Sequence, residues 1–434
     1  MKVGFVSLGC SKNLVVTEEM IGLFKKHDYE IVSDPSEAEI IVINTCGFIE
    51  SAKDEGVKTI LEMSDYKEDK CKYLIVTGCL VERYKTELNE ALPEVDLFVK
   101  ISEYNDLWKM IDSLIKNNIG DDKMDYHYRM ITTGDTMAYL KIAEGCSNYC
   151  TYCAIPYIQG KYVSRKYEDI LEEADMLAKK GIKELVVIAQ DTTKYGYDLY
   201  GKYRLPELLD DLCKIDGIKW IRFLYSYPES ITDELIEVVK RNDKVCKYFD
   251  LPIQHISDSI LKKMNRKSDG NTIRNLIKKL RKEIPDVILR TTLIVGFPGE
   301  SEDNFNELCE FVKEYRFDRL GAFAYSIEDG TPAAKFPNQL DKKTKNKRQE
   351  KIMLIQQDVS KDILASRIGK VYECMIENIT DDGEYYIARS YMDVPSEDGV
   401  IYVKYDSSIM MNEFVDVRIV DSSHYDLIGE IVNK

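Results

Sequence analysis

Three cysteines with a fixed spacing are the strongest chemical feature of this 434-residue sequence. Cys146, Cys150 and Cys153 form a CxxxCxxC motif. Three thiolates on one short loop can hold three corners of a four-iron cluster and leave the fourth iron open to a ligand. A zinc site or a ferredoxin-type cluster needs a fourth ligand, and no further Cys or His follows within 50 residues. The motif therefore predicts an iron–sulfur centre that does catalysis.

A second set of cysteines lies in the first quarter of the chain. Cys10, Cys46 and Cys79 each follow an apolar run that we expect to be a parallel strand. The carboxyl ends of parallel strands meet at one edge of a sheet, so these thiols are expected to converge on a second cluster site. Cys71 precedes its strand and is excluded. The remaining cysteines lack ligand spacing and are expected to be buried thiols: Cys213, Cys246, Cys309 and Cys374.

Composition restricts the class of protein. Apolar residues make up 44% of the chain and charged residues 31%, with a net charge of −16 and a pI near 5.0. No apolar run reaches the roughly 18 residues of a membrane span, and the N-terminus does not resemble a signal peptide. We therefore expect a cytoplasmic protein whose eleven cysteines are reduced or bind metal, with no membrane and no DNA partner.

The elements that must position these cysteines fall into three parts, all within an α/β chain. Residues 1–118 alternate apolar runs with helical patterns, which predicts a parallel α/β domain that holds the auxiliary cluster. After a polar linker, residues 132–364 contain six strand–helix units and a charged connecting helix, which predict a partial (β/α)6 barrel. Residues 366–434 show short strands without helices and are expected to form a small antiparallel β-barrel.

A CxxxCxxC motif after the first strand of a partial barrel, with Tyr152 before its third cysteine, resembles the radical S-adenosylmethionine (SAM) superfamily. The resemblance implies that the open iron binds SAM and that one electron cleaves SAM to a 5′-deoxyadenosyl radical. With a second three-cysteine set and a terminal barrel of the TRAM type, the whole chain resembles the methylthiotransferases, which replace C–H by C–S–CH₃. This implies two 4Fe-4S clusters, of which the one at Cys10, Cys46 and Cys79 delivers sulfur.

Local motifs resemble the branch of that family that modifies protein rather than tRNA, although Ala388 replaces an expected glycine. That branch acts on the β-carbon of an aspartate in small-subunit ribosomal protein S-twelve (uS12), and it needs a sulfur donor and a low-potential electron donor of the flavodoxin or ferredoxin type. A tRNA adenosine methylthiotransferase is the first alternative, and a non-catalytic two-cluster electron carrier is the second. The motifs are Gly9–Leu14, Asn44–Glu50, Gln190–Thr193, Tyr225–Pro228 and Gln254–Asp258.

The charge of the last segment supports the same branch without reference to the family. Residues 369–434 contain fourteen acidic and five basic side chains, so −9 of the net charge lies in this predicted barrel. A barrel that binds RNA needs a basic face, whereas an acidic one attracts a basic protein. Surface acids that serve only solubility are the alternative. Docking by charge should weaken with salt.

Candidate cofactor-binding residues lie at or near predicted strand ends. Besides Tyr152, they are Gln190, Arg222, Arg290, Gly296 and Glu300, with Thr292 as a further strand residue. Glycines in the turn from Gly296 to Glu300 would allow close approach to SAM, although an ordinary strand-to-helix turn has the same composition. An arginine that points inward would suit a carboxylate, and one that points outward would pair on the surface.

Asp191, His255 and Tyr325 are the candidate catalytic residues, because each ends a predicted barrel strand. The alternatives are helix capping for Asp191 and a structural role for His255. A basic run, Lys342–Lys351, could bind RNA, but we interpret it as the solvated face of the connecting helix.

Overall fold

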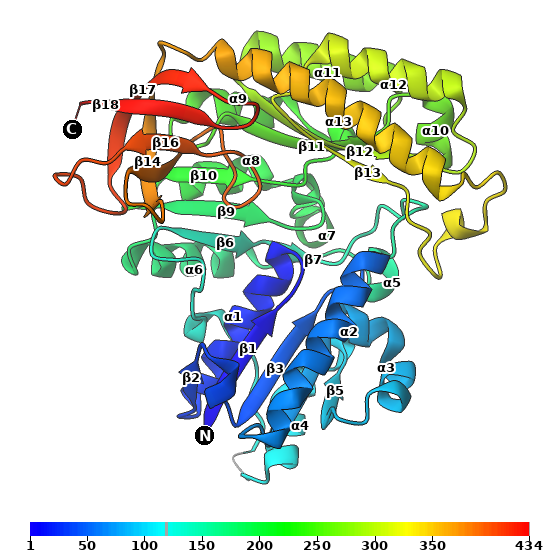
Figure 1. Ribbon diagram of the computed structural model, residues 1–434, viewed down its shortest axis with the longest axis vertical. Coiled ribbons are helices and arrows are strands. Elements are labelled where there is room, and N and C mark those ends of the chain that lie inside the picture. The colour runs from blue at the N-terminus through cyan, green and yellow to red at the C-terminus, as the bar shows by residue number, and fades with distance from the viewer. Residues whose placement is uncertain (118–119, 434) are drawn as a thin grey trace.

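The computed structural model describes residues 1–117 and 120–433, so the expected domain bounds at residues 118 and 434 lie outside the described residues. Figure 1 shows an N-terminal α/β domain below a larger body that contains the central strands and the terminal barrel. In the described part of the chain, no helix is long and apolar enough to cross a membrane.

The N-terminal domain is built on one parallel sheet with strand order β2-β1-β3-β4-β5. The central strand β3, with the sequence IIVINT, is buried along its whole length because helices cover both faces. The short edge strand β2 was missed, since its three residues carry too little pattern to predict. The strands are β1 Lys2–Ser7, β2 Glu30–Val32, β3 Ile40–Thr45, β4 Tyr73–Gly78 and β5 Leu97–Val99, and the helices are α1 Ser11–Lys26, α2 Glu50–Ser64, α3 Cys79–Ala91 and α4 Leu107–Ile115.

The middle of the chain forms six parallel strands in two sheets, with orders β10-β9-β6 and β11-β12-β13. A single parallel bridge, Ile221 to Val245, joins the two sheets into the expected partial barrel. The strands are β6 Met137–Lys141, β9 Glu184–Ile188, β10 Trp220–Phe223, β11 Tyr248–Gln254, β12 Ile288–Val295 and β13 Arg319–Ala324, while β7 Ala143–Glu144 and β8 Val163–Ser164 form a small separate ladder.

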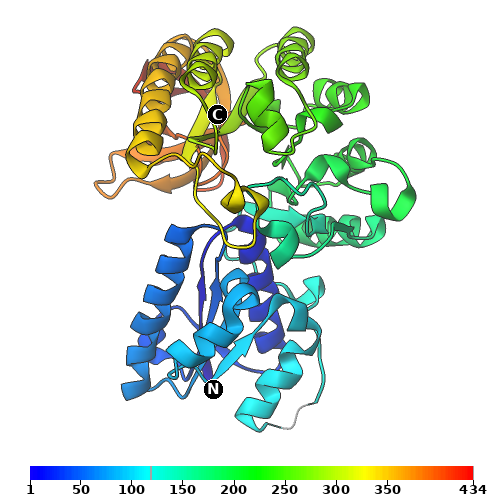
Figure 2. The same ribbon diagram turned by 90° about the vertical axis from the view of Figure 1, so that its right-hand side faces the viewer.

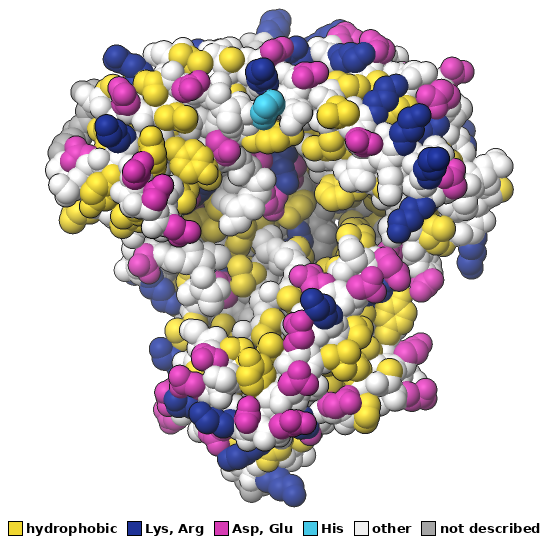
Figure 3. Space-filling model, in the orientation of Figure 1, with side chains coloured by type: hydrophobic (Ala, Val, Ile, Leu, Met, Phe, Trp, Pro, Cys, Tyr) yellow, Lys and Arg dark blue, Asp and Glu magenta, His cyan; other side chains and the backbone are white. Residues whose placement is uncertain are grey.

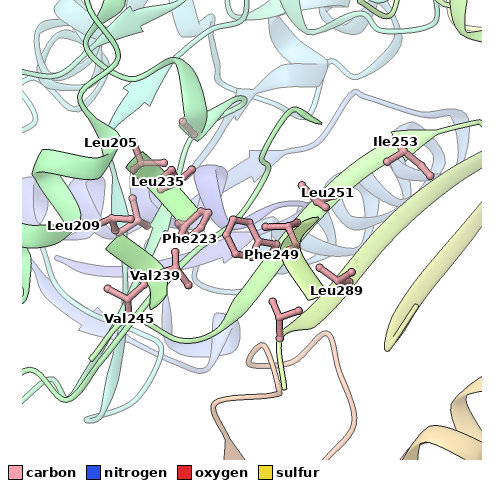
Figure 4. Packing of buried hydrophobic residues seen from close by; sticks show 14 of the residues in the cluster. Leu205, Leu209, Phe223, Leu235, Val239, Val245, Phe249, Leu251, Ile253 and Leu289 are labelled. Atoms are coloured by element: carbon pink, nitrogen blue, oxygen red, sulfur yellow. The ribbon is translucent and has the colours of Figure 1, made fainter. Parts of the chain in front are cut away.

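Helices cover the outer face of these strands. Within the main core, Phe223 of β10 meets Phe249 of β11 edge to face, with ring centroids 5.3 Å apart, and Val245 packs beside them (Figure 4). Side-chain packing thus continues across the junction between the sheets. The helices of this part are α5 Ile155–Ile158, α6 Tyr167–Lys179, α7 Tyr197–Tyr200, α8 Leu205–Leu212, α9 Asp233–Arg241, α10 Asp258–Lys263, α11 Gly270–Glu283, α12 Glu302–Tyr315 and α13 Lys342–Ala365.

The terminal segment is a closed barrel with strand order β14-β15-β16-β18-β17. The expectation of a fully antiparallel barrel was wrong at one pair, because β16 and β18 run parallel. The reason is geometric: an odd number of strands cannot close into a ring with every neighbour antiparallel. The strands are β14 Val371–Ile379, β15 Tyr385–Ser390, β16 Ile401–Lys404, β17 Phe414–Ser422 and β18 Leu427–Asn433.

The terminal barrel packs against the inner face of the central strands. Val186 and Ile188 of β9 belong to one apolar cluster with Met375 and Tyr386 of the terminal barrel, whereas the alternate residues of β9 pack against the outer helices. Because side chains alternate along a strand, the barrel covers the inside of the partial barrel. The mouth near the cysteines stays on the side of the N-terminal domain.

Two ion-pair networks fix the N-terminal domain to the central part. In the linker, buried Arg129 binds Glu18 of α1 at 2.6 Å and Glu173 of α6 at 2.6 Å. On the other side, Glu328 pairs with Arg83 at 3.1 Å. Figure 2 shows the yellow loop that carries Glu328 reaching down to the N-terminal domain. The linker is therefore packed more tightly than its polar composition indicates.

Candidate cluster and cofactor site

The CxxxCxxC loop is held by its backbone on both sides. The amide of Cys146 donates to the carbonyl of Gly160 at 3.1 Å, and that of Thr151 donates to Met264 at 3.1 Å. At Gly145, φ is +66° and an added Cβ would lie 2.2 Å from the Lys161 carbonyl oxygen, so only glycine fits. Gly145 therefore fixes the backbone conformation at the start of the loop.

Two thiols of this loop, Cys146 and Cys150, are buried, and Cys153 is half-buried. Burial, with a contribution from the neighbouring Cys150, raises the pKa of Cys146 to about 11. Burial also raises the pKa of Cys153, and Cys150 adds to the shift. The middle thiol, Cys150, lies 3.8 Å from the hydroxyl of Tyr227 and 3.8 Å from a guanidinium nitrogen of Arg266. The structure thus brings the three predicted thiols together.

The second set converges as expected at the carboxyl edge of the N-terminal sheet. Cys10 precedes α1, Cys46 follows β3, and Cys79 begins α3. Burial raises the pKa of Cys79 to about 12, and both Cys10 and Cys46 add to the shift. A Cβ on Gly9 would lie 2.7 Å from that of Cys46, so the loop of Cys10 packs directly on the loop of Cys46.

The donor sets fit clusters rather than single ions. Among the described residues, no three Cys, His, Asp or Glu side chains stand close enough to bind one metal ion. A cluster with an iron at each corner holds its thiolates farther apart than one ion does, and thiolates are the ligands that such clusters use. Each set supplies three neighbouring thiols at one edge of a sheet or barrel, and each therefore suits a 4Fe-4S cluster with one open iron.

A short segment separates the two sets of thiols. Cys79 packs against Ala154 and Ile158, which directly follow the CxxxCxxC motif. The side-chain nitrogen of Gln159 donates toward the Cys79 sulfur at 3.9 Å, and its side-chain oxygen accepts from the side chain of Gln190 at 2.8 Å. The two sites are thus adjacent, and Gln190 reaches the second site through Gln159. No cysteine spacing or strand end marked Gln159 or Arg266, and sequence reasoning missed both.

Tyr152, Tyr325 and the turn after β12 meet in one small apolar cluster. The ring of Phe297 lies 5.2 Å from that of Tyr325. Burial raises the pKa of Tyr325 to about 12, while a hydrogen bond with the side chain of Gln339 opposes the shift. Tyr152 and Tyr325 thus lie against the turn after β12.

The turn from Gly296 to Glu300 is closed by its own carboxylate. One oxygen of Glu300 accepts the backbone N–H groups of Gly296 at 2.7 Å and Phe297 at 3.2 Å. The other accepts from Arg348 of α13 at 2.8 Å. Gly296 has φ of +72°, and an added Cβ would lie 2.5 Å from the side chain of Lys345. Arg348 and Lys345 are therefore buried, and the expectation of a wholly solvated basic run on α13 was wrong at these two positions.

His255 is fully buried at the end of β11. Its Nδ1 accepts the N–H of Ser257 at 3.0 Å, while Nε2 has no hydrogen-bond partner among the described residues and lies 3.8 Å from Glu300. Burial lowers the pKa of His255 to about 3, and the charge of Arg348 adds to the shift. The imidazole is neutral at physiological pH and reaches the turn after β12 rather than the cysteines.

Asp191 supports the CxxxCxxC loop from β9. Its carboxylate accepts from the side chains of Asn148 at 2.9 Å and Thr193 at 2.5 Å. Burial raises the pKa of Asp191 against these hydrogen bonds. The residue stands at the start of a short 3₁₀ turn, yet its side chain does not cap that turn. Its visible role is to hold Asn148, which lies between two cluster cysteines.

The three strand positions with polar side chains lie deeper in the barrel. Arg222 is fully buried and donates to Glu184 at 2.9 Å and to the carbonyl of Tyr391 at 2.8 Å, so it ties β10 to the terminal barrel. Arg290 pairs with Glu397 of the terminal barrel and lies 3.5 Å from Asp250. Thr292 is half-buried on the same face of β12 as Arg290. Within the described part of the chain, none of the three forms a hydrogen bond with a thiol of either predicted cluster site.

A cavity of about 830 Å³ opens between the three parts of the molecule. It is lined by Cys10 and Ser11, by Tyr139 and Tyr225 of the central part, and by acidic residues of the terminal barrel including Glu397. Figure 3 shows the surface hollowed between the upper and lower bodies. Lys12 lies over the ring of Tyr225 at 3.4 Å, and Tyr225 itself has φ of +60°, an uncommon backbone for a tyrosine. The cavity therefore connects the acidic residues of the terminal barrel with Cys10.

Comparison with known proteins agrees with this arrangement. Residues 140–312 match the radical SAM superfamily, residues 2–100 match an uncharacterized protein family named UPF0004, and residues 368–432 match the TRAM domain. The fold resembles a radical S-adenosylmethionine methyltransferase, TsrM, from Kitasatospora setae, with a TM-score of 0.58 and 11% identity over 76% of each chain. That likeness concerns the fold alone.

Curated relatives match over the full chain. A ribosomal protein uS12 methylthiotransferase RimO from Alkaliphilus oremlandii is 63% identical over 436 residues, which cover 100% of both chains. The protein of the same name from Clostridioides difficile strain 630 is 51% identical over 440 residues, which cover 100% of this chain and 99% of the other. With two three-cysteine sites, a radical SAM core and a TRAM barrel in place, the chain belongs to the RimO family of radical SAM methylthiotransferases, whose cofactors are SAM and 4Fe-4S clusters.

Proposed function

We propose that this protein adds a methylthio group to the β-carbon of an aspartate in ribosomal protein uS12. The observation that carries the proposal is the adjacency of the two cysteine sets across the segment Ala154–Ile158. A radical formed on one side and a sulfur held on the other must reach the same carbon, and that requires neighbouring sites. The relatives at 51% to 63% identity act on uS12 by name, which supports the choice of substrate.

The proposed roles of the residues follow from their positions. Cys146, Cys150 and Cys153 would hold the cluster that binds SAM, which supplies the radical when bound, and Cys10, Cys46 and Cys79 would hold the cluster that supplies sulfur. Tyr152, Tyr325 and the turn at Gly296–Glu300 line the SAM side. Asp191 and Gln190 position the loops, and His255, a neutral imidazole whose Nδ1 accepts from Ser257, offers a hydrogen bond from Nε2–H.

The acidic terminal barrel would receive the substrate. Arg222 and Arg290 bind the terminal barrel to the central part and so orient Glu397 over the cavity. A basic loop of the ribosomal protein would enter along these carboxylates and bring its aspartate toward Cys10. Binding of uS12 should weaken as salt is raised from 50 to about 300 mM, and salt-independent binding would contradict the electrostatic part. The reaction would take place in the cytoplasm, with a sulfur donor still to be identified.

The test is intact-mass analysis of small-subunit ribosomal proteins from cells with and without the gene. We expect uS12 to carry about 46 Da more when the gene is present, because SCH₃ replaces H. A change confined to tRNA nucleosides would instead support the tRNA-modifying alternative.

Purified variants separate the two halves of the reaction. Cys150→Ala should lose SAM cleavage, whereas Cys46→Ala should still cleave SAM but leave uS12 unmodified. Cys213→Ala serves as the matched control, since Cys213 is half-buried and remote from both sets. If neither Cys150→Ala nor Cys46→Ala differs from the control, the proposed roles of the two sets are wrong.

A further inference from the structure

The segment from Lys262 to Lys267 covers the CxxxCxxC loop from outside. Thr151 of the loop donates from its hydroxyl to the carbonyl of Lys263 at 2.8 Å and from its amide to that of Met264 at 3.1 Å. In return, the side chain of Asn265 donates to the carbonyl of Tyr149 at 3.0 Å. These three hydrogen bonds attach the segment, which begins in the last turn of α10, to the loop of the radical cluster.

The same segment presents uncompensated positive charge. Lys262, Lys263 and Lys267 are exposed, and none of them forms an ion pair with a described residue. The acids nearest in sequence, Asp258 and Asp269, accept from the backbone of Gly270 and Thr272 and form no ion pair with these lysines, which leaves a net positive charge on residues 258–269. In a chain with a net charge of −16, this is a local reversal of sign.

Neighbouring elements extend this positive surface. Figure 3 shows Lys and Arg side chains gathered on the right of the molecule, over α10 and the first turns of α13. Lys342, Lys343 and Lys347 of α13 are exposed and likewise form no ion pair with a described residue. An acidic protein that approaches this side therefore meets a field of opposite sign.

A buried arginine links this surface to a cluster ligand. Arg266 lies between the exposed lysines, stacks on the ring of Tyr227 at 4.2 Å and places a nitrogen 3.8 Å from the sulfur of Cys150. Tyr149, which precedes Cys150 in sequence, leaves 44% of its surface exposed. Arg266 thus joins the segment of the exposed lysines to the sulfur of Cys150.

We propose that Lys262, Lys263 and Lys267 form the docking surface for an acidic one-electron carrier protein that reduces the radical cluster. The inference rests on the radical SAM activity, which consumes one electron for each SAM cleaved. In this step one electron leaves the reduced carrier and the cluster gains it, while no bond is made or broken. Charge complementarity would steer the carrier to the surface and raise its association rate. Attachment of the lysines to the cluster loop, rather than to a groove that could follow a phosphate backbone, favours a redox partner over RNA.

The test compares two charge-reversed variants of the cluster-loaded enzyme. One carries Lys262→Glu, Lys263→Glu and Lys267→Glu. The control carries Lys25→Glu, Lys70→Glu and Lys109→Glu, three exposed lysines of the N-terminal domain that form no ion pair with a described residue, so its net charge is the same. Calorimetry measures the Kd for flavodoxin at low and high salt. SAM cleavage is then driven either by reduced flavodoxin or by dithionite, which needs no docking.

We expect the first variant to bind flavodoxin at least about tenfold more weakly than the control does, with flavodoxin-driven cleavage lowered by a similar factor. Its dithionite-driven rate should stay within about twofold of wild type. An unchanged flavodoxin Kd overturns the proposal. If the first variant lost binding to ribosomal RNA fragments while its flavodoxin binding was unchanged, the lysines would be assigned to nucleic acid and the proposal would also be overturned. If dithionite drives no cleavage in any variant, the proposed function fails, and the flavodoxin Kd still decides the docking surface.

Discussion

At the scale of single residues, the cluster loop depends on side chains outside it. Asp191 holds Asn148, and Arg266 and Tyr227 contact the sulfur of Cys150. These contacts come from the segments after β9, after β10 and after α10, so the loop is fixed from several directions. Cofactor loops need this kind of support because small displacements of reacting groups are costly.

Removing the carboxylate of Asp191 tests this support. We expect Asp191→Ala to lower SAM cleavage about 10- to 100-fold through misplacement of the loop. Asp191→Asn, which keeps an oxygen that can accept from Asn148, should fall between the alanine variant and wild type. Iron bound at Cys10, Cys46 and Cys79 should not change. SAM cleavage by Asp191→Ala at the wild-type rate would show that Asn148 does not need this partner.

His255 gives a prediction about pH. Its folded pKa of about 3 lies below the ordinary value of 6.5, so between these pH values the unfolded chain takes up a proton that the native protein does not. The free energy of unfolding should therefore fall as pH drops below 6.5. For His255→Gln, the free energy of unfolding measured by urea titration should fall less steeply between pH 6.5 and 4.5 than it does for wild type. His424→Gln, at an exposed site, should follow wild type. Parallel curves for all three proteins would contradict the burial argument.

At the scale of elements, α13 stabilises the turn after β12. Arg348 reaches Glu300 from this helix, and the same carboxylate holds the backbone of Gly296 and Phe297. A helix that is far from the cysteines in sequence thus shapes the turn at Gly296–Glu300, for which we propose contact with SAM. The connecting helix has a second role besides joining two parts of the chain.

Arg348→Met should lower the free energy of unfolding by about 3 kcal/mol, because Glu300 is left buried without its cation. The KM for SAM should rise as the turn loosens. Urea unfolding and initial-rate kinetics measure the two effects. Lys347→Met, at the exposed neighbouring position, should leave both unchanged. If Arg348→Met lost stability but kept the wild-type KM for SAM, the contact of Arg348 with Glu300 would have no role in SAM binding.

The helices and strands also show which features of the structure the sequence could predict. The six barrel strands and the three strand ends that carry Cys10, Cys46 and Cys79 were predictable, because buried parallel strands have continuous apolar runs. The burial of Lys345 and Arg348 could not be predicted, because the many lysines of α13 obscure the apolar periodicity of that helix. Gln159 and Arg266 gave no signal either. Their roles depend on contacts between segments far apart in sequence, such as that of Gln159 with Cys79.

At the scale of the whole molecule, the ion pairs between domains set the distance between the two cysteine sets. Glu18 accepts from Arg129 and also from the backbone of Thr132 at 2.6 Å, while Arg83 pairs with Glu328 on the opposite side. Both networks are buried or nearly so, and both join the N-terminal domain to the central part. They hold the domain that carries Cys10, Cys46 and Cys79 against the part that carries the CxxxCxxC loop.

Loss of one network should therefore uncouple the two chemistries. We expect Glu18→Gln to cleave SAM within about twofold of wild type, yet to modify uS12 at least about tenfold more slowly. Glu19→Gln, the adjacent and half-exposed position, is the control. Measuring 5′-deoxyadenosine and modified uS12 in one reaction gives the ratio directly. An unchanged ratio would mean that the domain contact does not limit sulfur transfer.

The junction between the two central sheets has a mechanical consequence. Among the described residues, no ladder joins their backbones; they are linked by the bridge from Ile221 to Val245 and by a hydrogen bond from the Ser226 amide to the Asp250 carbonyl at 2.9 Å, while the contact of Phe223 with Phe249 carries the core across. Apolar contacts have no preferred direction, unlike a ladder of hydrogen bonds. The junction therefore depends more on side-chain packing than on a strand ladder, so substitutions in the core at this line would alter the curvature of the partial barrel.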